Sequence, residues 1–188
     1  MRIKPILLLI LTLLSSASMA EEKTKLMTIA GGCFWCMEPI FESTDGVVKA
    51  TVGYGGGTTA NPTYEKMGDH YELAQIEYYP SKVSFNELLK IYWYNIDAFD
   101  VGGQFYDRGK QYETAIFYHD TEQKLAAEQS KAEIEKKQGK KVATKILPFT
   151  NFYIAEDYHQ DYYKKNASHY NAYKNGSGRE EKLKNIWK

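Results

Sequence analysis

Cysteine and net charge are what this sequence of 188 residues has least of. It contains two cysteines, too few for a framework of disulfide bonds. Its 24 basic and 24 acidic side chains cancel, so it lacks the positive field that recruits nucleic acid or an anionic membrane. Hydrophobic residues make up 43% of the chain, enough for one domain with its own core. This composition excludes disorder, collagen and coiled coil.

The N-terminal segment reads MRIKPILLLILTLLSSASMA and differs from the rest of the chain. Arg2 and Lys4 precede an apolar stretch over residues 6–14, which ends in a small-residue cleavage pattern. That stretch is shorter than the roughly 20 residues needed to span a bilayer. The pattern predicts a signal peptide over residues 1–20 and a mature chain over residues 21–188. We therefore expect an exported protein in the bacterial periplasm, with no membrane contact after cleavage.

Strand and helix patterns alternate along the mature chain. Strand patterns occupy residues 26–30, 47–52, 73–79, 114–118 and 142–147. Helical patterns occupy residues 33–41, 84–92 and 121–137, with a capping box at Ser84 and Glu87 and a cap at Thr121. The remainder reads as loop with one short helix near residues 156–164. This order predicts a two-layer α/β sandwich close to the ferredoxin-like plan, with an irregular C-terminal tail.

The two cysteines stand together in GGCFWC, residues 31–36, where a strand ends in a glycine turn and a helix begins. Free N–H groups at a helix start favour a thiolate, so we expect a lowered pKa for Cys33. Cys36 follows on the same helical face and can form a disulfide with Cys33. The pattern predicts a redox pair in which Cys33 attacks and Cys36 resolves.

A Cys-x-x-Cys pair has other uses as well. A static disulfide across so small a loop would stabilise the fold little. Zinc needs a second pair of ligands, and haem attachment needs a histidine where Met37 stands, so we expect no metal and no bound cofactor. A thioredoxin-like thiol–disulfide oxidoreductase of the periplasm is the alternative function that stays open at this point.

Five motifs follow one another between residues 26 and 165. They are Gly32-Cys33-Phe34-Trp35 with Glu38, the glycine loop 53–57 with Asn61-Pro62-Thr63-Tyr64, His70-Tyr71-Glu72, Asp107-Arg108-Gly109-Lys110-Gln111-Tyr112, and Ala155-Glu156-Asp157-Tyr158-His159-Gln160. Together they resemble the motifs of the type A peptide methionine sulfoxide reductases. The resemblance implies an enzyme that reduces methionine S-sulfoxide, free or in proteins.

The resemblance also implies roles for the matching residues in the chemical step. Cys33 would attack the sulfoxide sulfur, and Glu72 would donate a proton to the departing oxygen from a carboxyl with a raised pKa. Tyr64 and Tyr112 would donate hydrogen bonds to that oxygen as charge develops on it.

The resemblance assigns substrate binding and recycling of the enzyme to other residues. Phe34 and Trp35 would form an apolar pocket for the methyl group, and Asp107 would meet the substrate backbone. Many family members have glycine where Cys36 stands and resolve with cysteines near the C-terminus. Residues 166–188 contain no cysteine. Either Cys36 or an outside thiol must therefore resolve the sulfenic acid. We expect Cys36 to capture it as a disulfide, which a thioredoxin-type reductant would reopen.

Two other function classes, a thiol–disulfide exchanger and a sulfoxide-binding module, would not need all of these residues. A thiol–disulfide exchanger has no sulfoxide oxygen to protonate, and a sulfoxide-binding module would not need a cysteine pair. Glu156 and His159 are expected to hold the tail by hydrogen bonds. We further expect a monomer that binds no nucleic acid.

Overall fold

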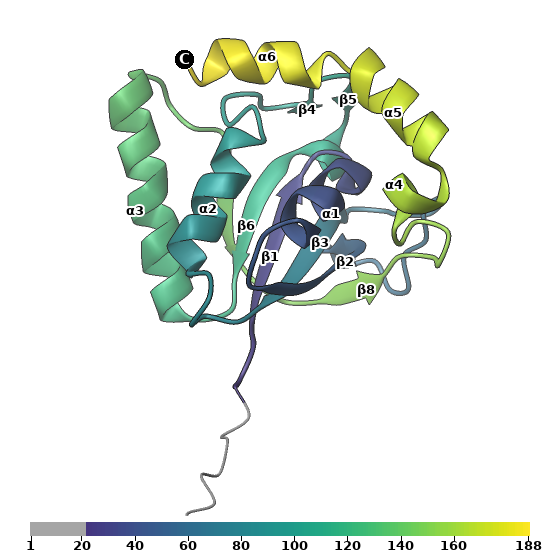
Figure 1. Cartoon of the computed structure of the whole chain (residues 1–188), viewed down its shortest axis with the longest axis horizontal. Coiled ribbons are helices and arrows are strands. Elements are labelled where there is room, and N and C mark those ends of the chain that lie inside the picture. Colours follow the sequence, from purple (N-terminus) through teal and green to yellow (C-terminus); the bar gives the residue numbers. More distant parts are fainter. Residues whose placement is uncertain (1–21) are drawn as a thin grey trace, which may run out of the picture.

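A six-stranded sheet forms the centre of residues 22–188, the part of the chain that the computed structural model describes (Figure 1). Its strands are β1 (Lys25–Gly31), β2 (Val47–Gly55), β3 (Tyr71–Tyr78), β6 (Thr114–Tyr118), β7 (Lys145–Pro148) and β8 (Phe152–Ile154). They lie in the order β7-β6-β1-β3-β2-β8; the β6–β7 pair is parallel and the other pairs are antiparallel. Strands β6-β1-β3-β2 have the order and directions of the predicted ferredoxin-like plan, which is confirmed.

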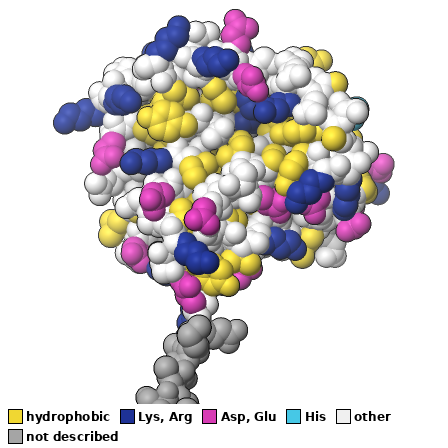
Figure 2. Space-filling model, viewed as in Figure 1, with side chains coloured by type: hydrophobic (Ala, Val, Ile, Leu, Met, Phe, Trp, Pro, Cys, Tyr) yellow, Lys and Arg dark blue, Asp and Glu magenta, His cyan; other side chains and the backbone are white. Residues whose placement is uncertain are grey.

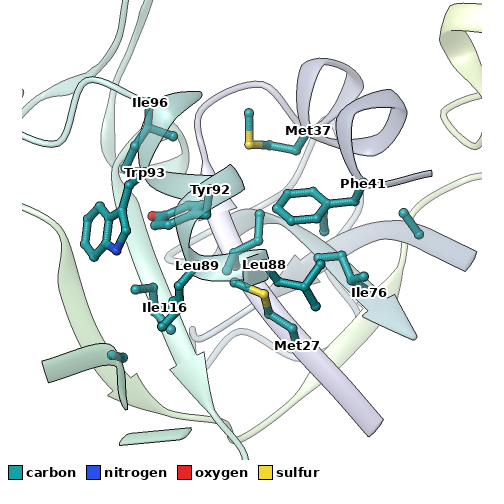
Figure 3. Close-up of a cluster of buried hydrophobic side chains, with 14 of the residues drawn as sticks. Met27, Met37, Phe41, Ile76, Leu88, Leu89, Tyr92, Trp93, Ile96 and Ile116 are labelled. Carbon is teal, nitrogen blue, oxygen red and sulfur yellow. The ribbon is translucent and has the colours of Figure 1, made fainter. Parts of the chain in front are cut away.

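Three helices form the second layer on one face of this sheet (Figure 1): α1 (Phe34–Glu42), α2 (Phe85–Tyr94) and α3 (Thr121–Gln138). A buried apolar cluster fills the space between the layers (Figure 3). The strands contribute Met27, Ile76 and Ile116, and the helices contribute Met37, Phe41, Leu88, Leu89, Tyr92 and Trp93. The expected two-layer α/β sandwich is therefore confirmed.

The helix starts follow local capping chemistry. Ser84 Oγ accepts a hydrogen bond from the Glu87 N–H at 3.2 Å, and the Glu87 carboxylate accepts one from the Ser84 N–H at 2.8 Å, so the predicted capping box is present. Helix α3 is capped by Asp120, whose carboxylate accepts from the Gln123 N–H at 2.8 Å. The prediction of Thr121 as the cap was wrong by one residue, because the preceding aspartate supplies the acceptor.

The C-terminal tail is the part of the fold that the sequence analysis described incorrectly. It was expected to be irregular after one short helix, but it forms α4 (Tyr162–Lys165), α5 (Ala167–Gly176) and α6 (Arg179–Ile186), with Gly178 at φ +68° between the last two. Tertiary contacts hold these helices, since Tyr170 is buried and the Trp187 Nε1–H donates to Ile96 O at 3.1 Å. In Figure 1, α5 and α6 (yellow) pass beyond the end of α1 that carries the cysteines.

Short elements complete the region around that end of the sheet. Strands β4 (Gly103–Gln104) and β5 (Asp107–Arg108) pair with each other, and the 3-10 helix η1 (Lys110–Tyr112) follows them. The predicted signal peptide, residues 1–20, lies outside the described residues. Among residues 22–188, no helix has the length and apolar character that crossing a membrane requires. Basic and acidic side chains are interspersed on the face that Figure 2 shows.

Candidate active site

Cys33 lies at the junction between β1 and α1. Gly32 makes the turn with φ +82°, and a Cβ at this position would lie 2.6 Å from the Gln104 Cβ, so a larger residue would not fit. Cys33 is the N-cap residue of α1, and the Cys36 N–H donates to its carbonyl oxygen at 3.1 Å. Both cysteines are buried free thiols. The first helical turn therefore holds the pair together, as the spacing predicted.

Glu72 extends from β3 to the same helix start. Its side chain is 1% exposed, and its Oε2 accepts a hydrogen bond from the Phe34 N–H at 2.9 Å. Burial raises the pKa of Glu72 to about 8, although the Phe34 N–H opposes the shift. The carboxyl is therefore mostly protonated at neutral pH, as a proton donor must be.

The expected lowering of the Cys33 pKa was wrong. The N–H of Phe34 at the helix start is bonded to Glu72, so it is not free to stabilise a Cys33 thiolate. Burial raises the pKa of Cys33 well above its ordinary value, and its hydrogen bond with Cys36 raises it further. In contrast, that hydrogen bond lowers the pKa of Cys36 to about 7. Hydrogen bonding between the two thiols thus favours ionisation of Cys36 and disfavours that of Cys33.

Tyr64 and Tyr112 come from separate segments and meet beside the dithiol. Their hydroxyls lie within hydrogen-bonding reach of each other. Burial raises the pKa of both, with the Glu72 carboxyl as the next cause, so both stay protonated and can donate. Tyr64 is 40% exposed, and its N–H donates to Glu156 Oε1 at 3.0 Å. Both tyrosines are partly exposed and feel the charge of Glu72, so a polar oxygen of a substrate could reach their hydroxyls.

The two aromatic residues after Cys33 differ in exposure. Phe34 is buried against the His159 ring at 5.0 Å between centroids. Trp35 is half-buried, stacks on Tyr162 at 3.8 Å, and donates from Nε1 to His159 Nδ1 at 3.0 Å. This hydrogen bond attaches the tail to α1, as expected of His159, and it also fixes the Trp35 ring. These rings form an apolar wall next to Cys33, and Trp35 is its accessible member.

Sequence reasoning missed Tyr173 of α5 entirely. Its hydroxyl donates to Asp107 Oδ2 and lies within hydrogen-bonding reach of the Cys33 sulfur. Burial raises the pKa of Asp107, and the hydrogen bond from Tyr173 opposes this shift. The spacing of Tyr170 and Tyr173 on one helical face was a usable signal, but it stood in a segment rich in lysine and asparagine.

All eight residues predicted for the site lie in this one region. Thiols, a buried neutral carboxyl and hydroxyl donors can together remove an oxygen atom from a substrate and leave it on sulfur. Among residues 22–188, the three-carboxylate group of Glu38, Glu42 and Asp161 has metal-like spacing, but the ammonium of Lys164 already bonds two of these carboxylates. Fold and site thus define a thiol-dependent oxidoreductase.

Comparison with known proteins identifies the family. The family model described as "Peptide methionine sulfoxide reductase" matches residues 25–188. Peptide methionine sulfoxide reductase MsrA 2 of Staphylococcus aureus (strain MW2) is 48% identical over 167 residues, covering 85% of this chain and 94% of the relative. The chain therefore belongs to the peptide methionine sulfoxide reductase family and, as its motifs indicated, to type A. It is an enzyme, a peptide-methionine (S)-S-oxide reductase.

Solved structures agree with this assignment. The reduced form of Mxr1 from Saccharomyces cerevisiae matches with a TM-score of 0.74 and 32% identity, covering 81% of this chain and 91% of that one. Mxr1 from the same organism in complex with Trx2 matches with a TM-score of 0.50 and 28% identity, covering 76% of this chain and 88% of that one. The two-layer fold is thus shared with known members of the family.

Proposed function

We propose that this enzyme reduces free and protein-bound methionine S-sulfoxide through a sulfenic acid on Cys33, which Cys36 resolves as a disulfide. The observation that carries the proposal is the arrangement around one helix start. Cys33 is the N-cap, Glu72 is bonded to the next N–H, and Cys36 lies one turn on.

In the first step, oxygen passes from one sulfur to another. The Cys33 sulfur attacks the sulfoxide sulfur and forms a transient bond to it. The oxygen then passes to the Cys33 sulfur, the S–O bond of the substrate and the transient sulfur–sulfur bond both break, and methionine leaves as the thioether. Glu72 donates a proton to the oxygen, and Tyr64 and Tyr112 stabilise the charge that develops there. The products are methionine and Cys33 sulfenic acid; the sulfenic hydroxyl carries the proton from Glu72, and the proton that the Cys33 thiol gives up restores the Glu72 carboxyl. A thiol–disulfide exchanger would have no use for these three donors.

Substrate selection rests on the remaining site residues. Trp35 and Phe34 offer the apolar wall for the methyl group on sulfur. Asp107 can accept a hydrogen bond from the substrate backbone, although Tyr173 occupies one of its oxygens in the reduced protein. A peptide must therefore share the carboxylate or displace the tyrosine hydroxyl.

The second step closes the disulfide and the third reopens it. The Cys36 thiolate attacks the sulfenic sulfur, the S–S bond forms, and the hydroxyl leaves as water after taking a proton. A thioredoxin-type dithiol then reduces the Cys33–Cys36 disulfide by exchange. Support for this partner comes from the match to Mxr1 solved in complex with Trx2.

Export to the bacterial periplasm is part of the same proposal. The basic start, short apolar stretch and small-residue cleavage pattern of residues 1–20 support it. We further propose that the mature enzyme acts as a monomer. Cell fractionation of the expressed full chain tests export, mass measurement of the N-terminus tests cleavage, and native mass measurement tests whether the mature enzyme is a monomer. A full-length chain retained in the cytoplasm would contradict export.

A single-turnover reaction of the reduced protein tests the chemistry. We expect one methionine per chain from the S epimer, none from the R epimer, and loss of both thiols. Cys36→Ser is the matched control for Cys33→Ser: the first variant should release one methionine and then stop with thioredoxin present, whereas the second should release none. Normal recycling by Cys36→Ser would refute the resolving role.

A further inference from the structure

Arg179, the first residue of α6, is a buried cation whose hydrogen-bond partners are neutral. Its side chain donates to Asn95 O at 2.6 Å and to Gly31 O at 3.2 Å, and the guanidinium lies 4.5 Å from the ring centre of Phe105. The residue is 4% exposed. Within residues 22–188, no carboxylate lies at ion-pair distance from it. Burial of such a charge is unfavourable unless an anion forms nearby.

The hydrogen bond to Gly31 places the guanidinium next to the turn that precedes Cys33. A Cβ on Gly32 would lie 3.6 Å from Arg179 Nη2, and Gly32 precedes Cys33 in the chain. A cavity of about 330 Å³ opens beside it and is lined by Cys36, Asn95, Lys174 and Arg179, among others. Cys36 and Arg179 therefore border the same cavity.

Several groups around Cys36 bear on its charge. From the elements packed against it these are Cys33, Glu72, Asp107, Tyr170, Tyr173, Lys174 and Arg179. Arg179 is the cation with the larger influence on the pKa of Cys36, and Lys174 is the smaller one. Burial and the Asp107 carboxylate act in the opposite direction. The neutral carboxyl of Glu72 adds little while it keeps its proton.

We propose that Arg179 is a positioning residue for the resolving step, in which its guanidinium stabilises the thiolate of Cys36 before that thiolate attacks the Cys33 sulfenic acid. The inference rests on the proposed resolving role of Cys36. The atoms balance as above: the S–S bond forms, the S–O bond breaks, and the hydroxide takes up a proton. The cation accelerates this step by raising the fraction of Cys36 that is ionised at neutral pH.

Removing the Arg179 charge should slow disulfide formation in a way that depends on pH, and it should leave the earlier release of methionine nearly unchanged. Loss of the charge raises the pH at which Cys36 ionises, and a shift of one unit from a pKa of about 7 leaves roughly fivefold less thiolate at pH 7. Above that pH the variant thiolate is at least as nucleophilic as the native one, so the rate recovers. Methionine release precedes this step and should change by less than about threefold.

The test is a rapid-mixing single turnover of the reduced full chain with methionine S-sulfoxide between pH 6 and 9. Methionine release reports the first step, and a nucleophilic sulfenic-acid trap with mass detection reports the lifetime of the Cys33 sulfenic acid. Arg179→Gln removes the positive charge, and Arg179→Lys keeps it on an ammonium group in place of the guanidinium. Lys184→Gln, on the exposed side of the same helix, is the matched control.

The expected result is a sulfenic acid that survives about fivefold longer in Arg179→Gln at pH 7, with recovery near pH 9 and substantial rescue by Arg179→Lys. Lys184→Gln should behave as the native chain. An unchanged lifetime and pH profile in Arg179→Gln overturns the inference, as does an equal defect in the Lys variant at all pH values. If Cys36→Ser loses its sulfenic acid as fast as the native chain does, the proposed resolving role itself fails. Because Cys36→Ser keeps Arg179, that result would contradict the resolving role of Cys36 and not the role of Arg179.

Discussion

Replacing Glu72 by glutamine removes one ionisable proton from the centre of the site and leaves its size nearly unchanged. The amide oxygen can still accept the hydrogen bond that the Phe34 N–H now donates to Oε2 at 2.9 Å. The variant therefore separates the proton of Glu72 from its packing. Two measurements follow from it, one on stability and one on catalysis.

The stability effect has a definite sign. Burial raises the pKa of Glu72 from 4.5 to about 8. Between these values the folded chain keeps the proton and the unfolded chain has lost it, so the free energy of unfolding falls as pH rises. The slope is about 1.4 kcal/mol per pH unit, and the whole interval corresponds to an upper bound of about 5 kcal/mol. Glutamine has no proton to lose, so Glu72→Gln should not show this decline.

Urea unfolding of both proteins between pH 5 and 9 measures the effect. The difference between the two curves isolates Glu72, because Glu38, whose pKa burial raises to about 7, contributes equally to both. We expect the variant to gain on the native chain steadily from pH 5.5 to 7.5. A flat difference curve would mean that Glu72 ionises normally in the folded protein, and it would refute the assignment of a neutral carboxyl.

The catalytic measurement uses the same pair of proteins. General acids contribute about 10²- to 10⁴-fold to proton-transfer steps, so methionine release in a single turnover should slow by that factor in Glu72→Gln. In the native chain the release rate should fall above about pH 8 as Glu72 loses its proton. If Glu72→Gln released methionine as fast as the native chain does, another group would supply the proton.

Three further substitutions address the surrounding groups. Tyr64→Phe and Tyr112→Phe should each slow methionine release by about 10²- to 10³-fold, which rapid-quench analysis measures; a change below threefold would exclude that tyrosine as an oxygen-binding donor. Tyr173→Phe should lower the free energy of unfolding by about 1.5–3 kcal/mol in urea titrations, because Asp107 loses a donor; equal stability would contradict the hydrogen bond. Trp35→Ala should cost about 3 kcal/mol by the same assay, and a loss below 1 kcal/mol would mean that the stack on Tyr162 contributes little.

The parts of the fold that the sequence predicted correctly depend on local signals. A short apolar run marked β1, alternating apolar residues marked β3, and the Ser84–Glu87 capping box marked the start of α2. The position of the cysteines at a strand-to-helix turn also followed from neighbouring residues, since glycine at φ +82° makes that turn. Such signals act within a few residues, so the sequence alone displays them.

The parts that could not be predicted depend on contacts between distant segments. Arg179 reaches Gly31 across 148 positions of the chain, and Tyr173 reaches Asp107 across 66. Neither pairing leaves a periodic pattern in the sequence. The direction of the Cys33 pKa failed for a related reason: a helix terminus contributes at most about 2 kcal/mol, whereas full burial can shift a pKa by several units.

Glu72 and Cys36 are driven toward opposite charge states on the two sides of Cys33. On one side, β3 carries Glu72 into a buried position with a single N–H donor, which keeps the carboxyl protonated up to about pH 8. On the other, the Cys33 thiol and the cations of the C-terminal helices lower the pKa of Cys36 to about 7. The reduced site therefore favours an acid on Glu72 and a thiolate on Cys36. The proposed reaction needs the acid in its first step and the thiolate in its second, so this separation lets one Cys33 serve both.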